Sequence, residues 1–163
     1  MLIVHHLNNS RSQRVLWLLE ELALPYEIKR YQRDPKTMLA PPELKRVHPL
    51  GKSPVLSDGE ATIAETGAIV EYCVGKAGGA LRPPEGSPER LAWTYWLHYA
   101  EGSAMPPLLL KLVFSTLPQR APALLRPFVR GVAARALAGF VDPQIKTHLD
   151  YIEGELTKSS WFA

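Results

Sequence analysis

The first 22 residues of the chain, MLIVHHLNNSRSQRVLWLLEEL (Met1–Leu22), decide its fold. They open with the apolar, β-branched run Leu2-Ile3-Val4 and pass through the polar residues Asn8-Asn9-Ser10. A helical pattern follows from Arg11, in which apolar residues recur at i, i+3, i+4 and i+7: Val15, Leu18, Leu19 and Leu22. This order of patterns predicts a strand, a polar loop and an amphipathic helix that ends at Pro25.

The residues that follow extend the alternation of strands and helices. Residues 26–31 alternate and predict a second strand, and residues 42–47 predict a short helix that begins at a proline. Residues 52–56 and 61–63 flank an Asp-Gly turn, which predicts an antiparallel hairpin. A further helix is expected from Thr66. The N-terminal region is therefore predicted to be an α/β domain of order βαβαββα.

The rest of the chain contains no strand pattern. We expect the α/β domain to span residues 1–78, a Gly- and Pro-rich linker to span residues 79–88, and an all-α domain to span residues 89–163. The chain has 15 prolines, nearly twice the average share of about 5%. Several of them fall within the helical region and should kink or interrupt its helices: Pro106, Pro107, Pro118, Pro122 and Pro127.

Composition narrows the class of protein. The 163 residues are 46% hydrophobic and 21% charged, which disfavours both a disordered and a membrane-embedded chain. The one cysteine, Cys73, excludes an internal disulfide and a multi-cysteine zinc site. The N-terminus lacks the basic region and the cleavage site of a secretory signal. We therefore expect a soluble, cytoplasmic protein.

The charge distribution does not favour a nucleic-acid or membrane partner. The net charge is +3. Between Glu101 and Asp142 there are five basic residues and no acidic one. This stretch lacks the interleaved aromatic residues of a base-stacking surface and the density of a polybasic anchor. A solvated helix face is the better interpretation, with no nucleic-acid partner and no membrane partner.

Two motifs that suggest other chemistry fail on inspection. Gly51-Lys52-Ser53 matches the end of a phosphate-binding loop, but the first glycine of that pattern would fall at Arg46. His5 and His6 adjoin the first strand, and without further ligands nearby in the sequence we interpret them as structural. No metal site is predicted.

Three other places have the chemistry of a binding site. The loop Asn8–Ser12 offers amide and hydroxyl groups at a helix N-terminus, where the positive potential favours a thiolate over a thiol. Ser53-Pro54 opens a strand, where a proline could expose the backbone of Ser53 to a bound peptide. Ala64–Gly67 joins a strand to a helix, where Thr66 can act as the cap and the first-turn N–H groups suit a carboxylate. Taken singly, each place is also explained by ordinary turn or capping roles.

Together and in this order, the three places resemble the thioredoxin-like N-terminal domain of cytosolic glutathione S-transferases, of the bacterial, serine or theta-like type. The resemblance rests on three blocks: SRSQRVLWLLEEL (Ser10–Leu22), HPLGKSPVL (His48–Leu56) and ETGAIVEY (Glu65–Tyr72). It covers residues 1–80. Residues 85–163 look like the first helices of the family's all-helical second domain.

The resemblance implies roles for individual residues. The loop before the first helix should present a hydrogen bond to the glutathione sulfur. Aligned on Arg14-Val15, the first catalytic serine of theta-like enzymes falls on Asn9 and the cysteine of beta-class enzymes falls on Ser10. We favour Ser10, with Asn9 and Ser12 as alternatives.

The same resemblance assigns the glutathione-binding residues. Lys52 would face the glycyl carboxylate, and Ser53, held by a cis Pro54, would pair its backbone with the cysteinyl unit. Glu65 and Thr66 would hold the γ-glutamyl end. Glutathione is thus the expected co-substrate, with no metal required.

The activity implied is attack of a glutathione thiolate on a small hydrophobic electrophile, a detoxification reaction. Four residues of the helical region are candidate walls of the electrophile pocket: Tyr95, Tyr99, Met105 and Phe114. Two alternatives remain, a glutathione-dependent disulfide reductase or peroxidase and a non-catalytic ligand- or protein-binding member of the fold. Family members usually continue beyond the position of Ala163, so we expect the helical domain to be truncated. We also expect a homodimer.

Overall fold

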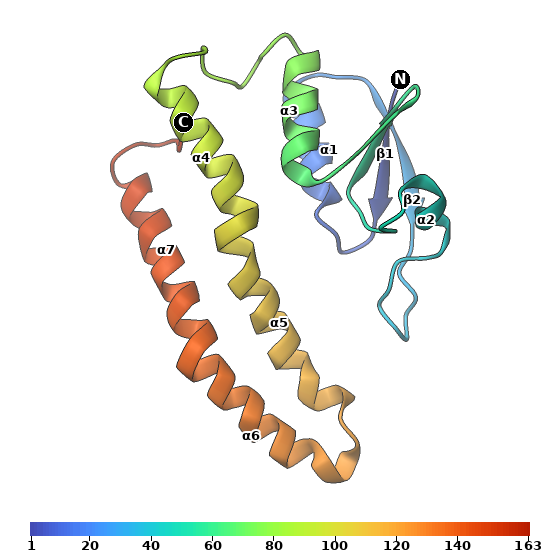
Figure 1. Ribbon diagram of the computed structural model, residues 1–163, viewed down its shortest axis with the longest axis vertical. Coiled ribbons are helices and arrows are strands. Elements are labelled where there is room, and N and C mark those ends of the chain that lie inside the picture. The colour runs from blue at the N-terminus through green and yellow to red at the C-terminus, as the bar shows by residue number, and fades with distance from the viewer. The chain divides into compact units, whose positions relative to one another are not determined.

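The computed structural model describes residues 1–163, which form two compact units, Met1–Arg82 and Pro83–Ala163. The first unit contains a sheet with helices on both faces, and the second contains only helices (Figure 1).

The sheet of the first unit has four strands in the order β2-β1-β3-β4. Their bounds are β1 Leu2–Leu7, β2 Tyr26–Tyr31, β3 Val55–Asp58 and β4 Ala61–Ala64. β1 pairs with β2 in parallel, whereas β3 is antiparallel to both β1 and β4. Gly59 takes a φ of +59° in the turn between β3 and β4, a conformation that glycine adopts without steric cost. The predicted βαβαββα order is confirmed.

Helices cover the two faces of this sheet. α1 (Ser12–Glu21) and α3 (Thr66–Lys76) share a core with one face, and α2 (Glu43–Val47) packs on the other through Leu44. Residues of β1 alternate between these faces, because successive side chains of a strand point to opposite sides. Leu2 and Val4 join the core under α1 and α3, whereas Leu7 joins the core under α2.

Asp58, at the end of β3, ties the strand to two other parts of the unit. Its carboxylate accepts hydrogen bonds from Lys76 and Tyr72 of α3 and pairs with the ammonium group of Met1. The bonds from Lys76, Tyr72 and the N-terminus, in that order, hold the pKa of Asp58 well below its usual range.

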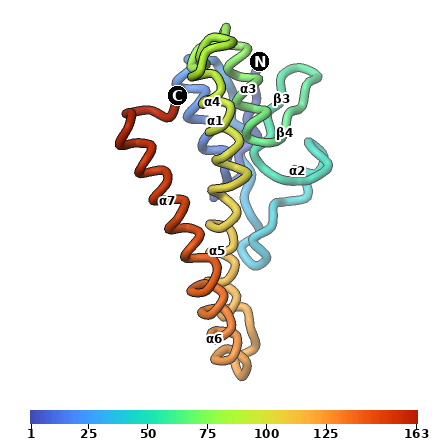
Figure 2. The backbone as a smooth tube through the Cα atoms, turned by 60° about the vertical axis from the view of Figure 1, so that its left-hand side comes forward, coloured from blue at the N-terminus to red at the C-terminus, as the bar shows by residue number.

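The second unit is a helical hairpin. Its main helices are α4 (Pro88–Tyr99), α5 (Met105–Arg120), α6 (Arg126–Ala136) and α7 (Asp142–Leu156). α4 and α5 follow one another along one arm, and α6 and α7 return along the other (Figure 2). Ser87 caps α4 by accepting the N–H of Arg90 at 3.1 Å.

The prediction that prolines kink or interrupt the helices holds only in part for the pair Pro106 and Pro107, because the regular α-helix is interrupted just before them but the helical arm does not end there. The π-helical turn η1 (Ala100–Ala104) joins α4 to α5 immediately before these prolines, and the helix continues through them. A second π-helical turn, η3 (Leu137–Val141), stands in the same position before Pro143 of α7. A π-helical turn accommodates the proline that follows it, because its shifted backbone hydrogen bonds do not require the N–H group that proline lacks.

The other prolines mark helix ends, as predicted. Pro118 lies in the last turn of α5, Pro122 precedes the 3₁₀ turn η2 (Ala123–Leu125), and Pro127 occupies the first turn of α6.

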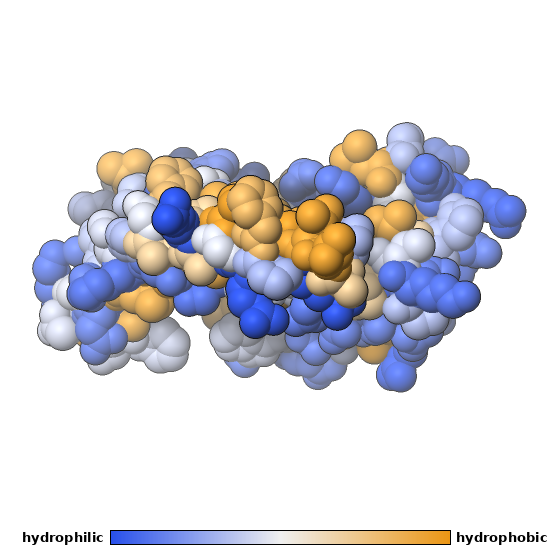
Figure 3. Space-filling model, turned by 90° about the horizontal axis from the view of Figure 1, so that it is seen from below, coloured by the Kyte–Doolittle hydropathy of each residue, from blue (hydrophilic) through white to orange (hydrophobic).

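The second unit exposes many apolar side chains. At the turn between α5 and α6, Leu124, Leu125 and Phe128 are exposed, and hydrophobic residues gather beside hydrophilic ones in the view from this end (Figure 3). None of its helices has the combined length and apolar character that crossing a bilayer requires.

Candidate functional site

The loop between β1 and α1 is held in place by Arg33, which follows β2. The backbone N–H of Arg33 donates to Asn8 Oδ1 at 2.7 Å, and its side chain donates to the carbonyl groups of Asn8 and Asn9. A third guanidinium bond reaches the carbonyl of Met38 at 2.9 Å. Asn9 takes a φ of +51°, in the left-handed region that asparagine tolerates better than most residues. The loop is therefore fixed by hydrogen bonds rather than by packing.

Ser10 lies at the centre of a group of hydroxyls. Its Oγ is 2.7 Å from Ser12 Oγ and 3.3 Å from Ser53 Oγ, and it accepts the backbone N–H of Ser12 at 3.3 Å. Ser12 is fully buried, and its Oγ is 2.8 Å from Nδ1 of His6. Asn9 is exposed on the loop, and its carbonyl accepts a hydrogen bond from Arg33. The structure thus brings Ser10 and Ser12 together with Ser53, which is more than 40 residues away in sequence.

The peptide bond between Ser53 and Pro54 is cis, as the resemblance implies. The Ser53 hydroxyl donates to the carbonyl of His5 at 2.8 Å, which ties the start of β3 to β1. Lys52 is exposed beside it. Gly51 precedes it with a φ of +58°, and a Cβ added there would lie 2.6 Å from the Lys45 side chain. The backbone conformation before the proline is therefore restricted, and the Lys52 side chain is exposed.

The junction of β4 and α3 differs from the predicted cap. Thr66 is the first residue of the helix, Glu65 occupies the N-cap position, and no side chain caps the helix. Because no side chain caps the helix, the N–H groups of its first turn are available to a ligand. Glu65 is exposed and has a φ of +71°, a strained conformation for a residue with a side chain. Strain of this kind is concentrated at functional sites.

The two neighbouring histidines of β1 point to different sides of the sheet. His5 is buried on the α2 side, where its Nδ1 lies 3.0 Å from the Tyr31 hydroxyl and its Nε2 lies 3.0 Å from Ser57 Oγ. Burial, with a smaller contribution from Lys29, lowers the pKa of His5. His6 faces Ser12 instead. Across residues 1–163 no group of three or more His, Cys, Asp or Glu side chains is arranged to hold a metal.

Cys73 lies in α3, within the core under the sheet, and is fully buried. Burial raises the pKa of its thiol to about 11. An uncharged, inaccessible thiol is a poor nucleophile, so Cys73 is a core residue and no part of the site.

The four candidate wall residues lie along α4 and α5. Tyr95 and Tyr99 stack on each other at 5.7 Å, and the Tyr99 hydroxyl is 2.6 Å from Nδ1 of His148 on α7. They belong to an aromatic cluster that also includes Trp96, Tyr151 and Phe162. Met105 and Phe114 are half-buried on α5.

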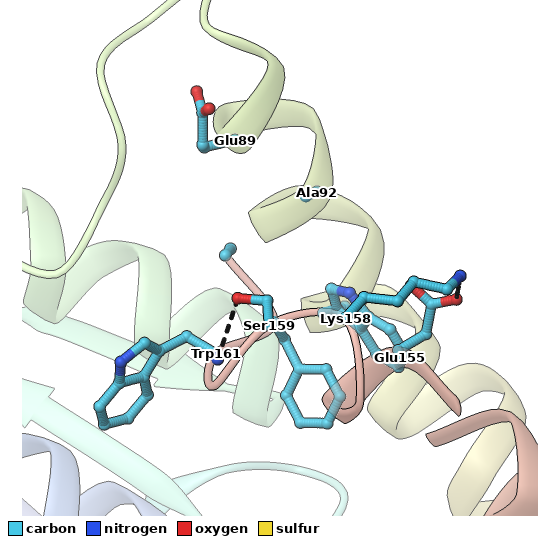
Figure 4. Close-up of a pocket in the computed structure, with 9 residues that line it drawn as sticks. Glu89, Ala92, Glu155, Lys158, Ser159 and Trp161 are labelled. Atoms are coloured by element: carbon cyan, nitrogen blue, oxygen red, sulfur yellow. Dashed lines mark hydrogen bonds and ion pairs between the residues drawn. The ribbon is translucent and has the colours of Figure 1, made fainter. Parts of the chain in front are cut away.

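A cavity of about 230 Å³ opens at the start of α4, and Trp96, Trp161 and Phe162 are among its lining residues. At its rim Lys158 pairs with Glu155, and the N–H of Trp161 donates to Ser159 (Figure 4). None of the four candidate wall residues lines this cavity.

Sequence reasoning placed Asn8 in the candidate loop, interpreted His6 as structural and missed Arg33. A signal for His6 and for Arg33 was present. β1 and β2 are parallel with Leu7 opposite Tyr31, so the residues that follow the two strands must meet at one edge of the sheet. His6 shares its parity with Leu2 and Val4, which places it on the α1 side of the sheet.

The chain is similar to known proteins of one family. The family model described as "Glutathione S-transferase, N-terminal domain" matches residues 1–75. Glutathione S-transferase 3 of Schizosaccharomyces pombe is 37% identical over 164 residues, covering 100% of this chain and 67% of its own length. Glutathione S-transferase 1 of Saccharomyces cerevisiae is 35% identical over 167 residues, covering 98% of this chain and 71% of its own.

The solved structures agree as well. A crystal structure of a glutathione S-transferase from Actinobacillus pleuropneumoniae superposes with a TM-score of 0.76 at 29% identity, over 99% of this chain and 69% of that one. The predicted architecture, a thioredoxin-like domain followed by a helical region, is confirmed. Two relatives are more than one-third identical to this chain, which covers 67% and 71% of their lengths, so the chain belongs to the glutathione S-transferase family.

Proposed function

We propose that this chain binds glutathione at the edge of the sheet formed by the β1–α1 loop, the cis-proline turn and the start of α3. In this proposal the hydroxyl of Ser10 donates a hydrogen bond to the glutathione sulfur. The observation that carries it is the meeting of Ser10 and Ser53 at 3.3 Å. The residue expected to contact the sulfur and the residue expected to pair with the cysteinyl backbone are neighbours in space.

Among the three candidate residues, burial and contacts favour Ser10. Ser12 has no exposed surface, so it cannot touch a ligand while it holds Ser10 and His6. The Asn9 carbonyl accepts from Arg33, which fixes its backbone, and its side chain belongs to no hydrogen-bonded group of the site. Ser10 is half-buried, in contact with the site on one side and accessible on the other.

The two ends of glutathione carry carboxylates, and the site offers a cationic or polarised group for each. The exposed Lys52 would attract the glycyl carboxylate. The uncapped first turn of α3, which begins at Thr66, would bind the γ-glutamyl carboxylate, and the Glu65 side chain would accept from its ammonium group.

The reaction then follows from differential stabilisation of the thiolate. A hydrogen-bond donor and a helix N-terminus favour the charged form of the sulfur and lower its pKa. A shift of two units corresponds to about 2.7 kcal/mol. One charge-assisted hydrogen bond with a helix terminus supplies an amount of that size. The thiolate attacks an electrophilic carbon and displaces its leaving group.

The chain's own thiol argues against a cysteine-based disulfide reductase. Cys73 is the one cysteine of these 163 residues, and it is buried with its pKa raised to about 11. A serine stands at position 10, where beta-class enzymes carry cysteine. Transferase chemistry, in which glutathione supplies the sulfur, needs no thiol from the protein.

The helical unit would supply the surface for the electrophile. Tyr95, Tyr99, Met105 and Phe114 give apolar and aromatic area suited to a small hydrophobic molecule. As the physiological setting we propose a detoxifying enzyme of the cytoplasm that acts as a homodimer, as the family resemblance implies. Light scattering of the purified protein and fractionation of the source cells test these two points.

Ser10→Ala tests the proposal directly. Glutathione should still bind, by calorimetry, while the pKa of its bound thiol rises and conjugation of a chloronitrobenzene at neutral pH falls by about 10²-fold. Ser115→Ala, an exposed serine on α5, is the matched control and should leave both unchanged.

Two results would overturn the proposal. The first is an absence of glutathione binding by the unmodified protein. The second is an unchanged pH profile in Ser10→Ala, which would move the role to Asn9. Parallel hydroperoxide and mixed-disulfide assays separate the transferase from the peroxidase and reductase alternatives.

A further inference from the structure

Four hydroxyl and imidazole groups form a continuous hydrogen-bonded chain beneath the proposed sulfur site. It runs from His6 Nδ1 to Ser12 Oγ at 2.8 Å, on to Ser10 Oγ at 2.7 Å, and then to Ser53 Oγ at 3.3 Å. Each hydroxyl has one proton to donate, so the direction of the whole chain can be found by counting protons.

The Ser53 end of the chain has a fixed direction. Ser53 Oγ lies 2.8 Å from the carbonyl oxygen of His5, and a carbonyl can only accept, so the Ser53 proton is used there. Ser53 therefore offers only lone pairs to Ser10. The contact between Ser10 and Ser53 is a hydrogen bond only if Ser10 is the donor.

The remaining bonds follow from this one. If Ser10 donates to Ser53, it must accept from Ser12, both from the Ser12 hydroxyl and from the Ser12 N–H at 3.3 Å. Ser12 has then used its proton and must accept from His6. Nδ1 of His6 must carry a hydrogen.

The opposite direction leaves one contact without a proton. If Nδ1 of His6 is bare, Ser12 donates to it and Ser10 donates to Ser12. Ser10 and Ser53 then face each other at 3.3 Å with lone pairs only. In that arrangement the Ser10 proton is also turned inward, away from any bound sulfur.

From this count we propose that His6 is a positioning residue that acts through Ser12. With Nδ1 protonated, it orders the chain so that the proton of Ser10 points away from Ser12 and toward Ser53. The inference rests on the proposed role of Ser10. In the free protein the Ser10 proton is donated to Ser53. On binding of glutathione it turns to the thiolate, which is the stronger acceptor. Successive donors polarise one another, so the final donor is strengthened.

The first test needs no ligand. In protein labelled with ¹⁵N at histidine, nitrogen chemical shifts distinguish a protonated Nδ1 from a protonated Nε2. The His6 signals are assigned by their loss in His6→Asn. We expect Nδ1 of His6 to carry the proton at neutral pH in the free protein. A bare Nδ1 would overturn the inference while leaving the role of Ser10 open.

The second test measures the pKa of the bound glutathione thiol by its ultraviolet thiolate absorbance. His6→Leu removes the donor and should raise this pKa by about one unit, roughly a tenfold loss of thiolate at neutral pH. His6→Asn places an amide N–H close to the position of Nδ1 and should restore most of the effect. Ser12→Ala should match His6→Leu.

The double variant separates action through Ser12 from a general disturbance. In a Ser12→Ala background, His6→Leu should add nothing, because the connection is already broken. Additive effects, or no effect of His6→Leu, would overturn the inference. Tyr31→Phe is the control for stability, because it removes a buried hydrogen bond from the other histidine, His5, and should leave the thiol pKa unchanged. If Ser10→Ala itself has no effect on the thiol pKa, the proposed role of Ser10 is wrong. That result would not contradict a proton on Nδ1 of His6.

Discussion

The two units of the chain use their apolar residues in opposite ways. Almost every buried hydrophobic side chain belongs to the first unit, and only Ala133 and Val141 belong to the second. The second unit displays long apolar side chains along both arms of its hairpin, for example Leu112 and Phe128. A two-layer domain buries both faces of its sheet, whereas two helix arms can bury only the line along which they touch. The first unit therefore buries its apolar residues in a core of its own, whereas the second leaves many large apolar side chains on its surface.

The largest expected effect comes from matched leucines in the two units. Leu19 of α1 is fully buried, whereas Leu112 of α5 is 60% exposed. Leu19→Ala should lower the free energy of unfolding by about 2–5 kcal/mol because it opens a cavity. Leu112→Ala should change it by less than about 0.5 kcal/mol. Urea unfolding followed by circular dichroism measures both. Equal losses would break the comparison, because they would show that Leu112 is covered in solution.

Thiol reactivity gives a second contrast. Cys73 is buried with its pKa raised to about 11, so it should react with a maleimide at pH 8 at least about 100-fold more slowly than an exposed cysteine. The reference is Ser115→Cys on α5, prepared in a Cys73→Ala background and followed by mass spectrometry. Comparable rates would mean that the core of the first unit opens readily.

Glu65 shows that the better-packed unit also holds backbone strain. Its φ of +71° costs a residue with a side chain about 1–3 kcal/mol, and glycine avoids most of that cost. Glu65→Gly should therefore raise the melting temperature and at the same time weaken glutathione binding. Differential scanning calorimetry measures the change in melting temperature, and isothermal titration calorimetry measures the change in glutathione affinity. A loss of stability would show that the Glu65 side chain supports the fold.

The smallest contrast concerns ion pairs. The folded state depresses the pKa of Asp58, so this carboxylate stabilises the protein above its unfolded pKa of about 3.9, and the contribution is lost as the pH falls below that value. Asp58→Asn should lower the melting temperature at pH 7, with a difference that shrinks below about pH 4.

The corresponding pair in the second unit is Lys111 with Asp142, at 2.9 Å and about half exposed on both sides. Lys111→Gln should change stability by less than about 0.5 kcal/mol, and 1 M salt should remove the difference. A Lys111 effect as large as that of Asp58 would contradict the contrast between the two units.

Local patterns were enough to predict the first unit, because its strands and helices are short and each carries its own periodicity. The range of β2 agrees with the alternation of residues 26–31. The hydrogen-bonded chain at Ser10 could not be predicted, because it joins His6, Ser12 and Ser53 through side-chain directions that no local pattern specifies. The cap was misplaced by one residue, because Glu65, which follows β4, takes the N-cap position in a conformation unusual for a glutamate.

The helical unit was harder for a different reason. The all-α character of residues 89–163 was predicted, but proline was interpreted by its usual effect on a regular α-helix. The structure keeps Pro106 and Pro107 inside a continuous arm by changing the local hydrogen-bonding pattern before them. That adjustment depends on backbone geometry and leaves no signature in hydrophobic spacing.

The π-helical turns change the direction in which the side chains beyond them point around the helix axis of each arm. An α-helix advances about 100° per residue, so one extra residue in a turn rotates everything beyond it by about that angle. A helical wheel drawn through η1 assigns α5 to the wrong side relative to α4, as would one drawn through η3 for α6 and α7. Tyr99 precedes η1 in the chain and Phe114 follows it. Whether the two side chains share a helix face is therefore judged after one residue is subtracted from their separation in sequence. A substitution that restored a regular α-turn there would rotate the far half of the arm without changing its composition.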